Sequence, residues 1–545
     1  MTKKLVAAFL SAVTLTAALA GCGDAKPSSS QTASSSQASS AAESSSQEEA
    51  YQHSYPLVDE KVSFTGAIWT PDYGKKEWLT KMEELTGVHF DWLDWSDWDT
   101  QYALSLASDN RPDLYFLGGK DKADAYDNGK AGIFVNYADY LKYMPNYCAI
   151  GEKDPQLWAA CKNEDGSIYS LSQYSATSTR ESAVIYARTD MLDEAGYSVP
   201  TTTDEFMQAI QGLQKFYGEK DSNFVAFQPY NAGHMDNAEN AFFPAFGDAV
   251  DPGFGLDSEG KVTYNYISDQ YKHYLEFMSE VYGSGAFDTN IYTEDGTNAK
   301  AKIQSNQTAF TTFGTCLTMD QFKSGHYDVI ALEPLTSQYT DTKKFPYRPL
   351  TNFIGMMISS DCKDVETLVK WVDTLYTPED KAINGFWGIS MWLGIQGEQW
   401  DYTSDDKTTY TIYPPEGMTS SQFLHDIWGT GNVIYCDVFK AVTVGAGNEG
   451  LGCKGTYTVQ NLWPYSVDVF PEMLLTFTEE EQDIVANKLS AIKTYVAAEK
   501  AKFIAGARSL DTWDSFVSDV KSMGIDDVIA AYNAAYARYL QLIND

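Results

Sequence analysis

Hydrophobic positions near the start of the folded chain switch between strand spacing and helix spacing. VSFTGAIW (62–69), VHFDWL (88–93) and RPDLYFLGG (111–119) are short apolar runs, which are typical of buried strands. Between the first two, KKEWLTKMEELTG places its apolar residues on one helix face, and Gly87 ends this helix. A second helix is expected around residues 100–107. This strand–helix order predicts a parallel sheet covered by helices.

The same α/β pattern continues through the rest of the chain. Thr202 and Glu205 have the spacing of a helix capping box. Apolar residues at helical spacing predict a helix over 364–376, and the chain ends in three further helical segments. Strands are expected at 308–314, 327–335 and 351–359, and FVAFQPYNAG (224–233) is expected to be a strand that runs into a polar aromatic loop.

Aromatic and acidic residues follow the first three predicted strands, in WTPDYG, DWSDWD and GGKDKADAY. Ligands of parallel sheets bind beyond the carboxyl ends of the strands. Indole rings stack on the apolar faces of sugars, and carboxylates accept hydrogen bonds from hydroxyl groups. The candidate ligand-binding residues from these segments are Trp69, Asp72, Tyr73, Trp95 and Asp121.

Each of these aromatic segments also has a purely structural interpretation. Trp92 is expected to pack in the core, whereas Trp95 is open between packing and ligand contact. Trp69 and Tyr73 either line a cleft or belong to a Pro-Asp turn with a packed indole.

The first fifty residues have the pattern of an export signal followed by a tether. Lys3 and Lys4 precede the apolar run 5–18, which falls short of the ~20 residues that span a bilayer. The sequence Leu-Ala-Gly-Cys ending at Cys22 resembles a bacterial lipobox, so Cys22 is expected to be lipidated. A Ser-rich tract follows and is expected to be disordered. The predicted parts are a signal peptide at 1–21 and the lipidated cysteine with its tether at 22–50.

Composition and charge exclude several classes of function. The net charge of −36 argues against binding to nucleic acid or to anionic lipid. Histidine is scarce and has no zinc-ligand spacing, so no metal site and no cofactor are expected. Of the seven cysteines, only Cys148 and Cys161 come into question as a disulfide, and buried free thiols are favoured.

Several segments together resemble the extracellular solute-binding proteins of ABC importers (family 1), in the oligosaccharide-binding lipoprotein group of Gram-positive bacteria. They occur in the order of that family and cover almost the whole mature chain. The segments are the lipobox and tether, WLTKMEELTGVHFDW, RPDLYF, DGSIYSL, YARTDMLDEAGYSVPTTTDEF, VKWVDTLYTPEDKAINGFWG with GIQGEQWDY, and FIAGARSLDTWDSFVSDVKSMGIDDVIAAYNAAYARYL.

This resemblance implies an α/β fold of the two-lobed periplasmic-binding-protein type (type II), with lobes joined by crossing segments. Lobe 1 would take 51–172 plus about 356–430, and lobe 2 would take 175–352 plus about 431–545. The first crossing is expected near 171–183 and the second near 351–357. Some relatives bind calcium in an acidic loop, but KFYGEKDSNFVAFQ lacks alternating oxygen ligands at the matching place.

The resemblance adds further candidates for the ligand site. Tyr230 lies in FQPYNAG, where a distant relative in fold presents an acid-Pro-Tyr loop to its sugar. Of Trp387 and Trp392 in FWGISMW, one is expected to face the ligand and the other the core. Tyr174 in the first crossing and Trp463 in NLWPYS complete the set.

The implied function is that of a lipid-anchored substrate-binding protein at the extracellular face of the cell membrane. It would capture a carbohydrate, expected to be an oligosaccharide, and deliver it to an ABC permease as a monomer, without being an enzyme. The alternative is a surface-anchored glycoside hydrolase or a sugar-binding adhesin. Paired carboxylates do not discriminate here, because 75 acidic residues always allow such a pair to be imagined.

Overall fold

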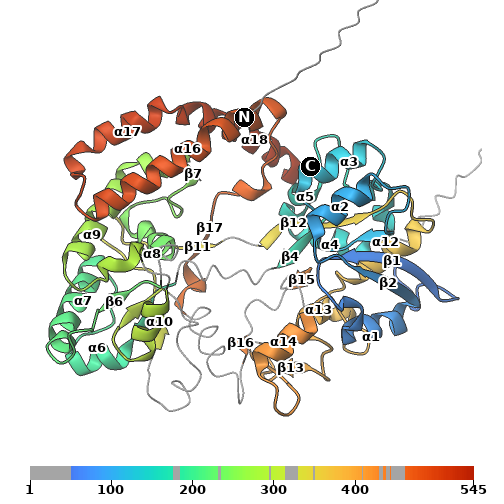
Figure 1. The fold of residues 1–545 in the computed structure, drawn as a ribbon, viewed down its shortest axis with the longest axis horizontal. Helices are drawn as coiled ribbons and strands as arrows, with labels where there is room; N and C mark the ends of the chain where they lie inside the picture. The colour runs from blue at the N-terminus through green and yellow to red at the C-terminus, as the bar shows by residue number, and fades with distance from the viewer. Residues whose placement is uncertain are drawn as a thin grey trace, which may run out of the picture. The chain divides into compact units, whose positions relative to one another are not determined.

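The first sheet has the strand–helix order that the hydrophobic pattern predicts. In the computed structural model, its elements are β1 (Val62–Ile68), α1 (Glu77–Thr86), β2 (Val88–Asp94), α2 (Trp98–Leu106) and β3 (Leu114–Tyr115). β1 pairs in parallel with both β2 and β3, and β1 and β2 run side by side in Figure 1. The residue after α1, Gly87, is left-handed with φ 75°, so the predicted helix stop is confirmed.

The structure describes most of the chain. The described residues are 51–175, 184–230, 235–293, 296–312, 329–347, 350–407, 409–428, 434–436, 442–443 and 461–544. The predicted signal peptide, lipobox and tether lie outside these residues.

Two strands from distant parts of the sequence extend the first sheet. β4 (Leu171–Ser175) and β12 (Leu350–Ile358) pair antiparallel with each other, and β12 also pairs antiparallel with β3. β15 (Tyr435–Cys436) adds to β4, which gives the strand order β15-β4-β12-β3-β1-β2. The predicted strand at 351–359 is therefore confirmed as β12.

Helices and a small sheet surround this first sheet. The predicted helix at 364–376 is confirmed as α12 (Val365–Thr374), with Leu368, Val369 and Val372 buried. The remaining elements are α3 (Lys122–Lys130), η2 (Tyr137–Tyr143), α4 (Pro145–Lys153), α5 (Gln156–Cys161), α12 (Val365–Thr374), α13 (Ser390–Leu393), β13 (Trp400–Tyr402), β14 (Thr409–Ile412), α14 (Ser420–Trp428) and β16 (Val442–Thr443).

The second sheet consists of short strands between long helices. Its strand order is β10 (Val329–Ala331), β5 (Tyr186–Arg188), β9 (Phe310–Thr311) and β6 (Phe227–Gln228). The sequence predicted strands over 308–314 and 327–335 and a strand that runs into a loop within 224–233. Of these ranges, 231–233, 313–314 and 327–328 lie outside the described residues. Phe224 is buried although it lies outside the strand ladder, so apolar burial here extends beyond backbone pairing.

Helices cover the second sheet. They are α6 (Thr189–Ala195), α7 (Thr203–Gly218), α8 (Met235–Phe242), α9 (Asp269–Gly283) and α10 (Thr297–Gln304), with a β7–β8 hairpin (Phe254–Leu256 and Val262–Tyr264). At the start of α7, the Glu205 backbone N–H donates to Thr202 Oγ1 at 3.2 Å. The Glu205 carboxylate accepts from the backbone N–H and the hydroxyl of Thr201 at 2.8 and 2.7 Å, so both residues of the predicted capping box lie at the start of this helix.

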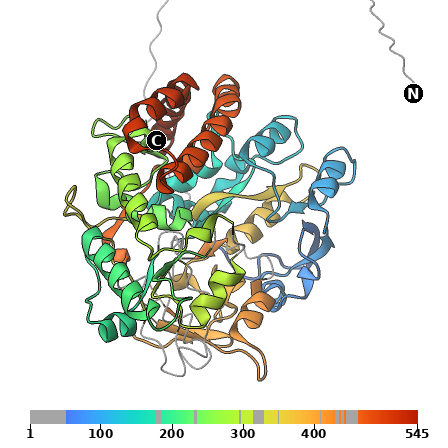
Figure 2. The same ribbon diagram turned by 60° about the vertical axis from the view of Figure 1, so that its left-hand side comes forward.

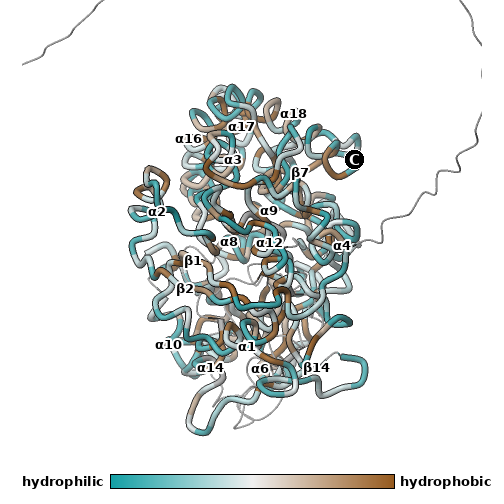
Figure 3. The backbone as a smooth tube through the Cα atoms, turned by 90° about the vertical axis from the view of Figure 1, so that its right-hand side faces the viewer, coloured by the Kyte–Doolittle hydropathy of each residue, from teal (hydrophilic) through white to brown (hydrophobic). Residues whose placement is uncertain are grey.

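Three helices end the chain, as the sequence predicts. They are α16 (Glu479–Ile504), α17 (Trp513–Ser522) and α18 (Ile525–Asn544), and α16 packs on α9 and α18. Figure 2 shows these helices, in red, beside the green elements of the second sheet. Their mixed hydrophobic and hydrophilic colouring in Figure 3 is that of helices with one buried face.

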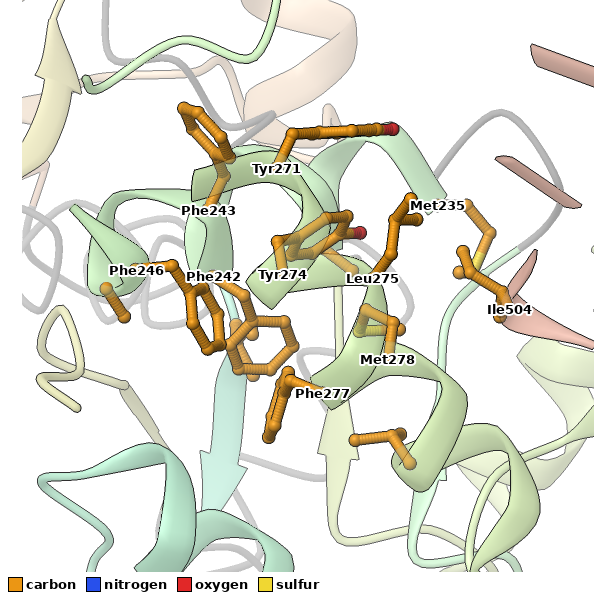
Figure 4. Close-up of a cluster of buried hydrophobic side chains, with 14 of the residues drawn as sticks. Met235, Phe242, Phe243, Phe246, Tyr271, Tyr274, Leu275, Phe277, Met278 and Ile504 are labelled. Atoms are coloured by element: carbon orange, nitrogen blue, oxygen red, sulfur yellow. The ribbon is translucent and has the colours of Figure 1, made fainter. Parts of the chain in front are cut away.

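Two main clusters of buried hydrophobic side chains draw on different parts of the chain. The first takes residues from 64–174 and 354–435, and we call the elements around it the first body. The second takes residues from 185–335 and 470–532, and we call its elements the second body. Figure 4 shows part of the second cluster, where Phe242 and Phe246 pack against Phe277 at ring-centroid distances of 5.2 and 5.5 Å. The α/β fold is confirmed, while the lobe boundaries stay a prediction.

The chain changes between the two bodies where the sequence predicts crossing segments. It leaves the first sheet after β4 and enters the second sheet at β5, and it returns at β12. Between β10 and β12 lies β11 (Phe345–Tyr347), which pairs in parallel with β17 (Ser466–Asp468). Part of the first crossing, 176–183, lies outside the described residues.

The described thiols are free. Cys148, Cys161 and Cys362 form no disulfide, so the pair that the sequence allowed is not linked. Burial is the main cause that raises the pKa of Cys148, to about 11, which keeps it a thiol at neutral pH. In the part of the chain that the structure describes, no helix has the length and hydropathy that a membrane crossing requires.

Candidate ligand-binding site

Trp69 lies at the carboxyl end of β1 and keeps 36% of its surface exposed. Its Nε1–H donates to the Leu117 carbonyl at 3.2 Å, in the loop that follows β3. Because β1 and β3 are parallel neighbours, this bond joins the carboxyl ends of two adjacent strands. This hydrogen bond fixes one end of the indole ring, and the exposed face of the ring stays accessible to a ligand.

Two more indoles gather at the same edge. The Trp95 backbone N–H donates to the Ile68 carbonyl at 2.7 Å, which places Trp95 just after β2 and next to the end of β1. The rings of Trp95 and Trp98 lie 5.4 Å apart, and Trp98 stacks on Tyr102 with an interplanar angle of 18°. Both indoles are half-buried. We call Trp69, Trp95 and Trp98 the aromatic edge.

A glycine pair allows the aromatic edge to form. A Cβ on Gly118 would lie 2.3 Å from the Trp98 ring, and a Cβ on Gly355 would lie 1.7 Å from the Gly119 nitrogen. Gly355 also has φ +66°, and its carbonyl accepts from the Gly118 backbone N–H at 3.1 Å. Only glycines fit this approach between the loop after β3 and strand β12, so the edge is held against a rigid backbone.

The acidic candidates lie at the surface of the first body. Asp72 is left-handed with φ 57°, its backbone N–H donates to Asp94 Oδ2 at 2.8 Å, and its Oδ1 accepts from Lys75 Nζ at 2.6 Å. Asp121 caps α3 by accepting from the Asp124 backbone N–H at 2.8 Å. Both carboxylates are exposed and keep oxygen lone pairs for further donors.

Two of the predicted ligand residues belong to the core. Tyr73 and Trp387 have no exposed surface, which corrects the expectation that Tyr73 lines a cleft and makes Trp387 the core member of the Trp387 and Trp392 pair. Tyr73 is enclosed by Trp78, Trp92 and Phe116, and burial holds the pKa of its hydroxyl well above the usual range. Trp387 donates from Nε1 to Gln396 Oε1 at 3.0 Å. These inward positions depend on contacts with residues outside the short motifs, such as Phe116 and Gln396, and the spacing of apolar residues could not show them.

Four further aromatic residues differ in exposure. Trp92 stacks on Phe90 at 5.1 Å, which confirms its expected packing role. Trp392, in α13, is half-buried against the first cluster. Tyr174 is buried in the sheet and stacks on Tyr435 of β15, with ring centroids 6.0 Å apart. Trp463 is half-buried, and its ring lies 5.0 Å from that of Tyr347.

In the second body, Tyr230 follows the short strand β6. Its ring is half-buried and lies over Gly296, where a Cβ would come within 2.7 Å of the ring. Gly296 is the N-cap of α10 and has φ 90°, so the tyrosine covers the start of that helix. The tyrosine is therefore seated on a helix start and not on the apolar cluster.

A buried polar network supports the Tyr230 loop, and the sequence analysis missed it. Lys302 Nζ pairs with Asp288 Oδ2 and donates to Gln228 Oε1 at 3.4 Å. Asp288 and Gln228 are buried, and the Gln228 amide donates to the Pro229 carbonyl at 2.9 Å. This network fixes the residues just before Tyr230. The three-residue spacing of tryptophans in DWLDWSDWD already indicated that Trp98 lies beyond the end of the strand, although it was not among the candidate residues.

The arrangement of the aromatic edge suits binding by stacking and hydrogen bonds. Exposed indole faces and surface carboxylates match the apolar faces and hydroxyl groups of carbohydrates. Among the residues that the structure describes, no group of three His, Cys, Asp or Glu side chains has the geometry of a metal site.

Comparison with known proteins gives relatives along nearly the whole chain. No family model matches. The fructooligosaccharide ABC transporter substrate-binding protein FusA of Streptococcus pneumoniae is 24% identical over 517 residues, which cover 89% of this chain and 92% of FusA. The lipoprotein LipO of Bacillus subtilis is 23% identical over 227 residues, which cover 40% of this chain and 42% of LipO.

Solved structures agree with these relatives. FusA of S. pneumoniae, as an EF-hand mutant in complex with fructo-nystose, matches with a TM-score of 0.62 and 20% identity, covering 88% of this chain and 100% of FusA. An HMO-binding, ABC-transporter-associated solute-binding protein from Bifidobacterium longum infantis matches with a TM-score of 0.65 and 14% identity, covering 88% and 99%. The resemblance in the sequence is confirmed: this chain is a homologue of an ABC transporter substrate-binding protein and has the fold of the solute-binding proteins.

Proposed function

We propose that this protein captures an oligosaccharide outside the cell and delivers it to an ABC permease. The observation on which the proposal depends is Trp69, an indole with an exposed face that a hydrogen bond to Leu117 holds at the carboxyl edge of β1. The printed functions of the relatives support it, since FusA is named for fructooligosaccharides and the bifidobacterial protein for HMO binding.

The ligand contacts in this proposal come from both bodies. Trp69 and Trp95 offer ring faces to sugar rings, and Asp72 and Asp121 offer acceptors to hydroxyl groups. Tyr230 from the second body would close on the same ligand with its ring and hydroxyl. Trp392, Tyr174 and Trp463 remain proposed contacts of the ligand.

Binding alone suffices for this function, and no bond in the ligand has to change. A ligand that contacts both bodies favours the conformation in which both sets of contacts are made, in proportion to its higher affinity for that conformation. A permease that distinguishes this conformation from the ligand-free one would then bind the loaded protein selectively. The crossing strands β4 and β12 pair with each other. In this proposal the two bodies move about this strand pair when they close on the ligand.

The test is a thermal-shift and calorimetric screen of the purified protein against fructo-oligosaccharides, milk oligosaccharides and malto-oligosaccharides. A ligand at 100 times its dissociation constant should add about 2.7 kcal/mol to the free energy of unfolding. We expect at least one oligosaccharide to bind, and chromatography after long incubation should recover it unchanged. Shortened products would favour the glycoside hydrolase alternative, and the absence of binding across the panel would contradict the proposal.

The proposed location is the extracellular face of the cell membrane, with an anchor at Cys22. The support is the lipobox-like sequence before Cys22, the relative LipO being named a lipoprotein, and the physics of acyl chains, whose burial contributes ~0.8 kcal/mol per methylene. Cys22→Ala should abolish metabolic labelling with palmitate and release the protein into the medium or leave a precursor. If a correctly matured Cys22→Ala protein stayed at the membrane, the proposed anchor would be wrong. The proposal of sugar binding would not be affected.

A further inference from the structure

A cavity of about 390 Å³ lies between α5 of the first body and α18 of the second body. Gln156 lines it from α5, and Tyr536, Tyr539, Leu540 and Ile543 line it from α18. The β7 strand, the β17 strand and the short helix η11 (Glu472–Leu474) form the other walls. None of the residues of the aromatic edge lines this cavity, so it is distinct from the proposed oligosaccharide site.

The walls of the cavity expose an unusual amount of apolar surface. Leu256, Val467 and Leu540 are exposed, and Met473 is 64% exposed, although all four are large hydrophobic residues. Isolated exposed hydrophobic residues need no explanation, but several around one cavity mark a site of interaction. The volume also lies in the range of about 300–1,000 Å³ that is usual for small-molecule sites.

Aromatic rings form one wall. Tyr536 and Tyr539 stack with centroids 5.8 Å apart and an interplanar angle of 16°, and the ring of Phe470 lies 5.3 Å from that of Tyr536. Such rings attract a cation that is placed over their faces.

The charged groups of the cavity are acidic. Asp248, Asp251 and Asp468 belong to the lining, which contains no Lys, Arg or His among the residues that the structure describes. Lys344 lies near the rim, but its Nζ already donates to Asp248 and to the Gly247 carbonyl at 2.9 Å. The Asp468 carboxylate makes no ion pair with a described residue. The pKa of Tyr539 is raised to about 12, first by burial and then by the nearby Tyr536, Asp154 and Asp468.

We propose that this cavity is a second binding site, for a small molecule that joins an apolar body to a cationic amino or ammonium group. The hydrophobic residues and tyrosine rings would take the apolar body, and Asp468 would be the counter-ion of the cation. An oligosaccharide does not fit this chemistry, because it has no charge to match Asp468 and would leave hydroxyl groups against Leu540 and Ile543. The site does not depend on the proposed transport function.

A matched pair of probes tests this proposal on the purified protein. 4-Phenylbutylamine is a cation at neutral pH, and 4-phenylbutanol has the same apolar body without the charge. Saturation-transfer NMR titration should show saturable binding of the amine, with the alcohol bound about two- to fivefold more weakly, as expected for one partly exposed ion pair. Asp468→Asn should weaken amine binding to the level of the alcohol. Val467→Trp should obstruct the cavity and weaken the binding of both probes.

Two controls make the result specific. Glu416→Gln removes the same charge from an exposed position that does not line the cavity, and it should leave amine binding unchanged. Thermal melting of each variant shows whether the fold is intact. Equal binding of amine and alcohol, an unchanged amine affinity in Asp468→Asn, or no saturable binding of either probe would overturn the proposal.

Discussion

The aromatic edge of the first body and the aromatic cluster of the second body both consist of aromatic residues, but the cluster packs in the core and the edge is the candidate ligand site. In the second body, Phe206, Phe242 and Phe277 are buried, and Phe242 packs edge to face on the other two rings. Figure 4 shows Phe242 beside Phe277. At the aromatic edge, Trp69 keeps a third of its surface exposed and is fixed by one hydrogen bond. The three phenylalanines lie within α7, α8 and α9, whereas Trp69 and Trp95 lie just beyond the ends of β1 and β2. A ring just beyond the end of a strand can face a ligand.

Trp69 and Tyr73 show this contrast within one short loop. Trp69 leaves the sheet at the end of β1, while Tyr73 begins a short helical turn (η1, Tyr73–Lys75) that folds back onto Trp92 and Phe116. Both residues follow the same strand, yet one is exposed and the other has no accessible surface. Substitution of an exposed ring such as Trp69 should therefore change ligand affinity, whereas substitution of a buried ring such as Tyr73 should change the stability of the fold.

The largest effect is expected from Phe242→Ala in the second body. Removing a fully buried phenylalanine from a packed cluster should lower the free energy of unfolding by about 3–5 kcal/mol. Urea unfolding followed by circular dichroism measures this, and the affinity of folded protein for oligosaccharide should stay close to that of the wild type. A stability loss below 1 kcal/mol would show that the cluster does not have the packed character seen in Figure 4.

Tyr230→Ala tests whether the second body contributes to the ligand site. We expect the dissociation constant for the oligosaccharide to rise by the equivalent of about 1–3 kcal/mol, because one ring contact and one hydrogen bond are lost. The half-buried ring lies over Gly296, so the melting temperature without ligand should fall much less than in Phe242→Ala. Tyr230→Phe separates the hydroxyl from the ring. Unchanged affinity in Tyr230→Ala would remove this residue from the site.

A buried charge between the bodies gives a pH-dependent prediction. Lys122 Nζ donates to the Ala159 carbonyl at 3.0 Å and to Thr476 Oγ1 at 3.2 Å, and burial lowers its pKa to about 8. In the unfolded chain the pKa is near 10.5, so between these values the unfolded state binds more protons and stability rises with pH.

The variant Lys122→Met isolates this contribution. Between pH 8 and pH 10, the unfolding free energy of the wild type should rise by about 2 kcal/mol relative to Lys122→Met. Comparing the two proteins cancels the titration of tyrosines in the same range. Parallel curves would mean that Lys122 keeps an ordinary pKa in the folded protein.

Much of the fold could be predicted because its elements have strong local signals. The spacing of Trp78, Leu79 and Met82 determines the buried face of α1, and Gly87 ends that helix, so β1, α1 and β2 were correctly placed. The strands of the second sheet were predicted too long, because apolar residues such as Phe224 are buried by packing outside the ladder. The spacing of hydrophobic residues alone does not distinguish burial within a paired strand from burial by packing outside it.

The candidate site could be predicted only as a region. The sequence placed aromatic residues after three strands, and the structure brings Trp69 and Trp95 together there. It could not show that Tyr73 and Trp387 turn inward, since that depends on contacts with Phe116 and Gln396 from other segments. The Lys302–Asp288 pair under the Tyr230 loop could not be predicted either, because its members lie fourteen positions apart in the sequence with no periodic signal between them.

The most direct test of the account is the Trp69→Ala variant, titrated by calorimetry with an oligosaccharide that binds the wild type. If the aromatic edge binds the carbohydrate, Trp69→Ala should lose about 1–3 kcal/mol of binding free energy, because the indole face no longer stacks on the sugar. The melting temperature without ligand should change little, since Trp69 contributes no buried core contact. Wild-type affinity in a folded Trp69→Ala protein would contradict the central claim that this edge binds the carbohydrate.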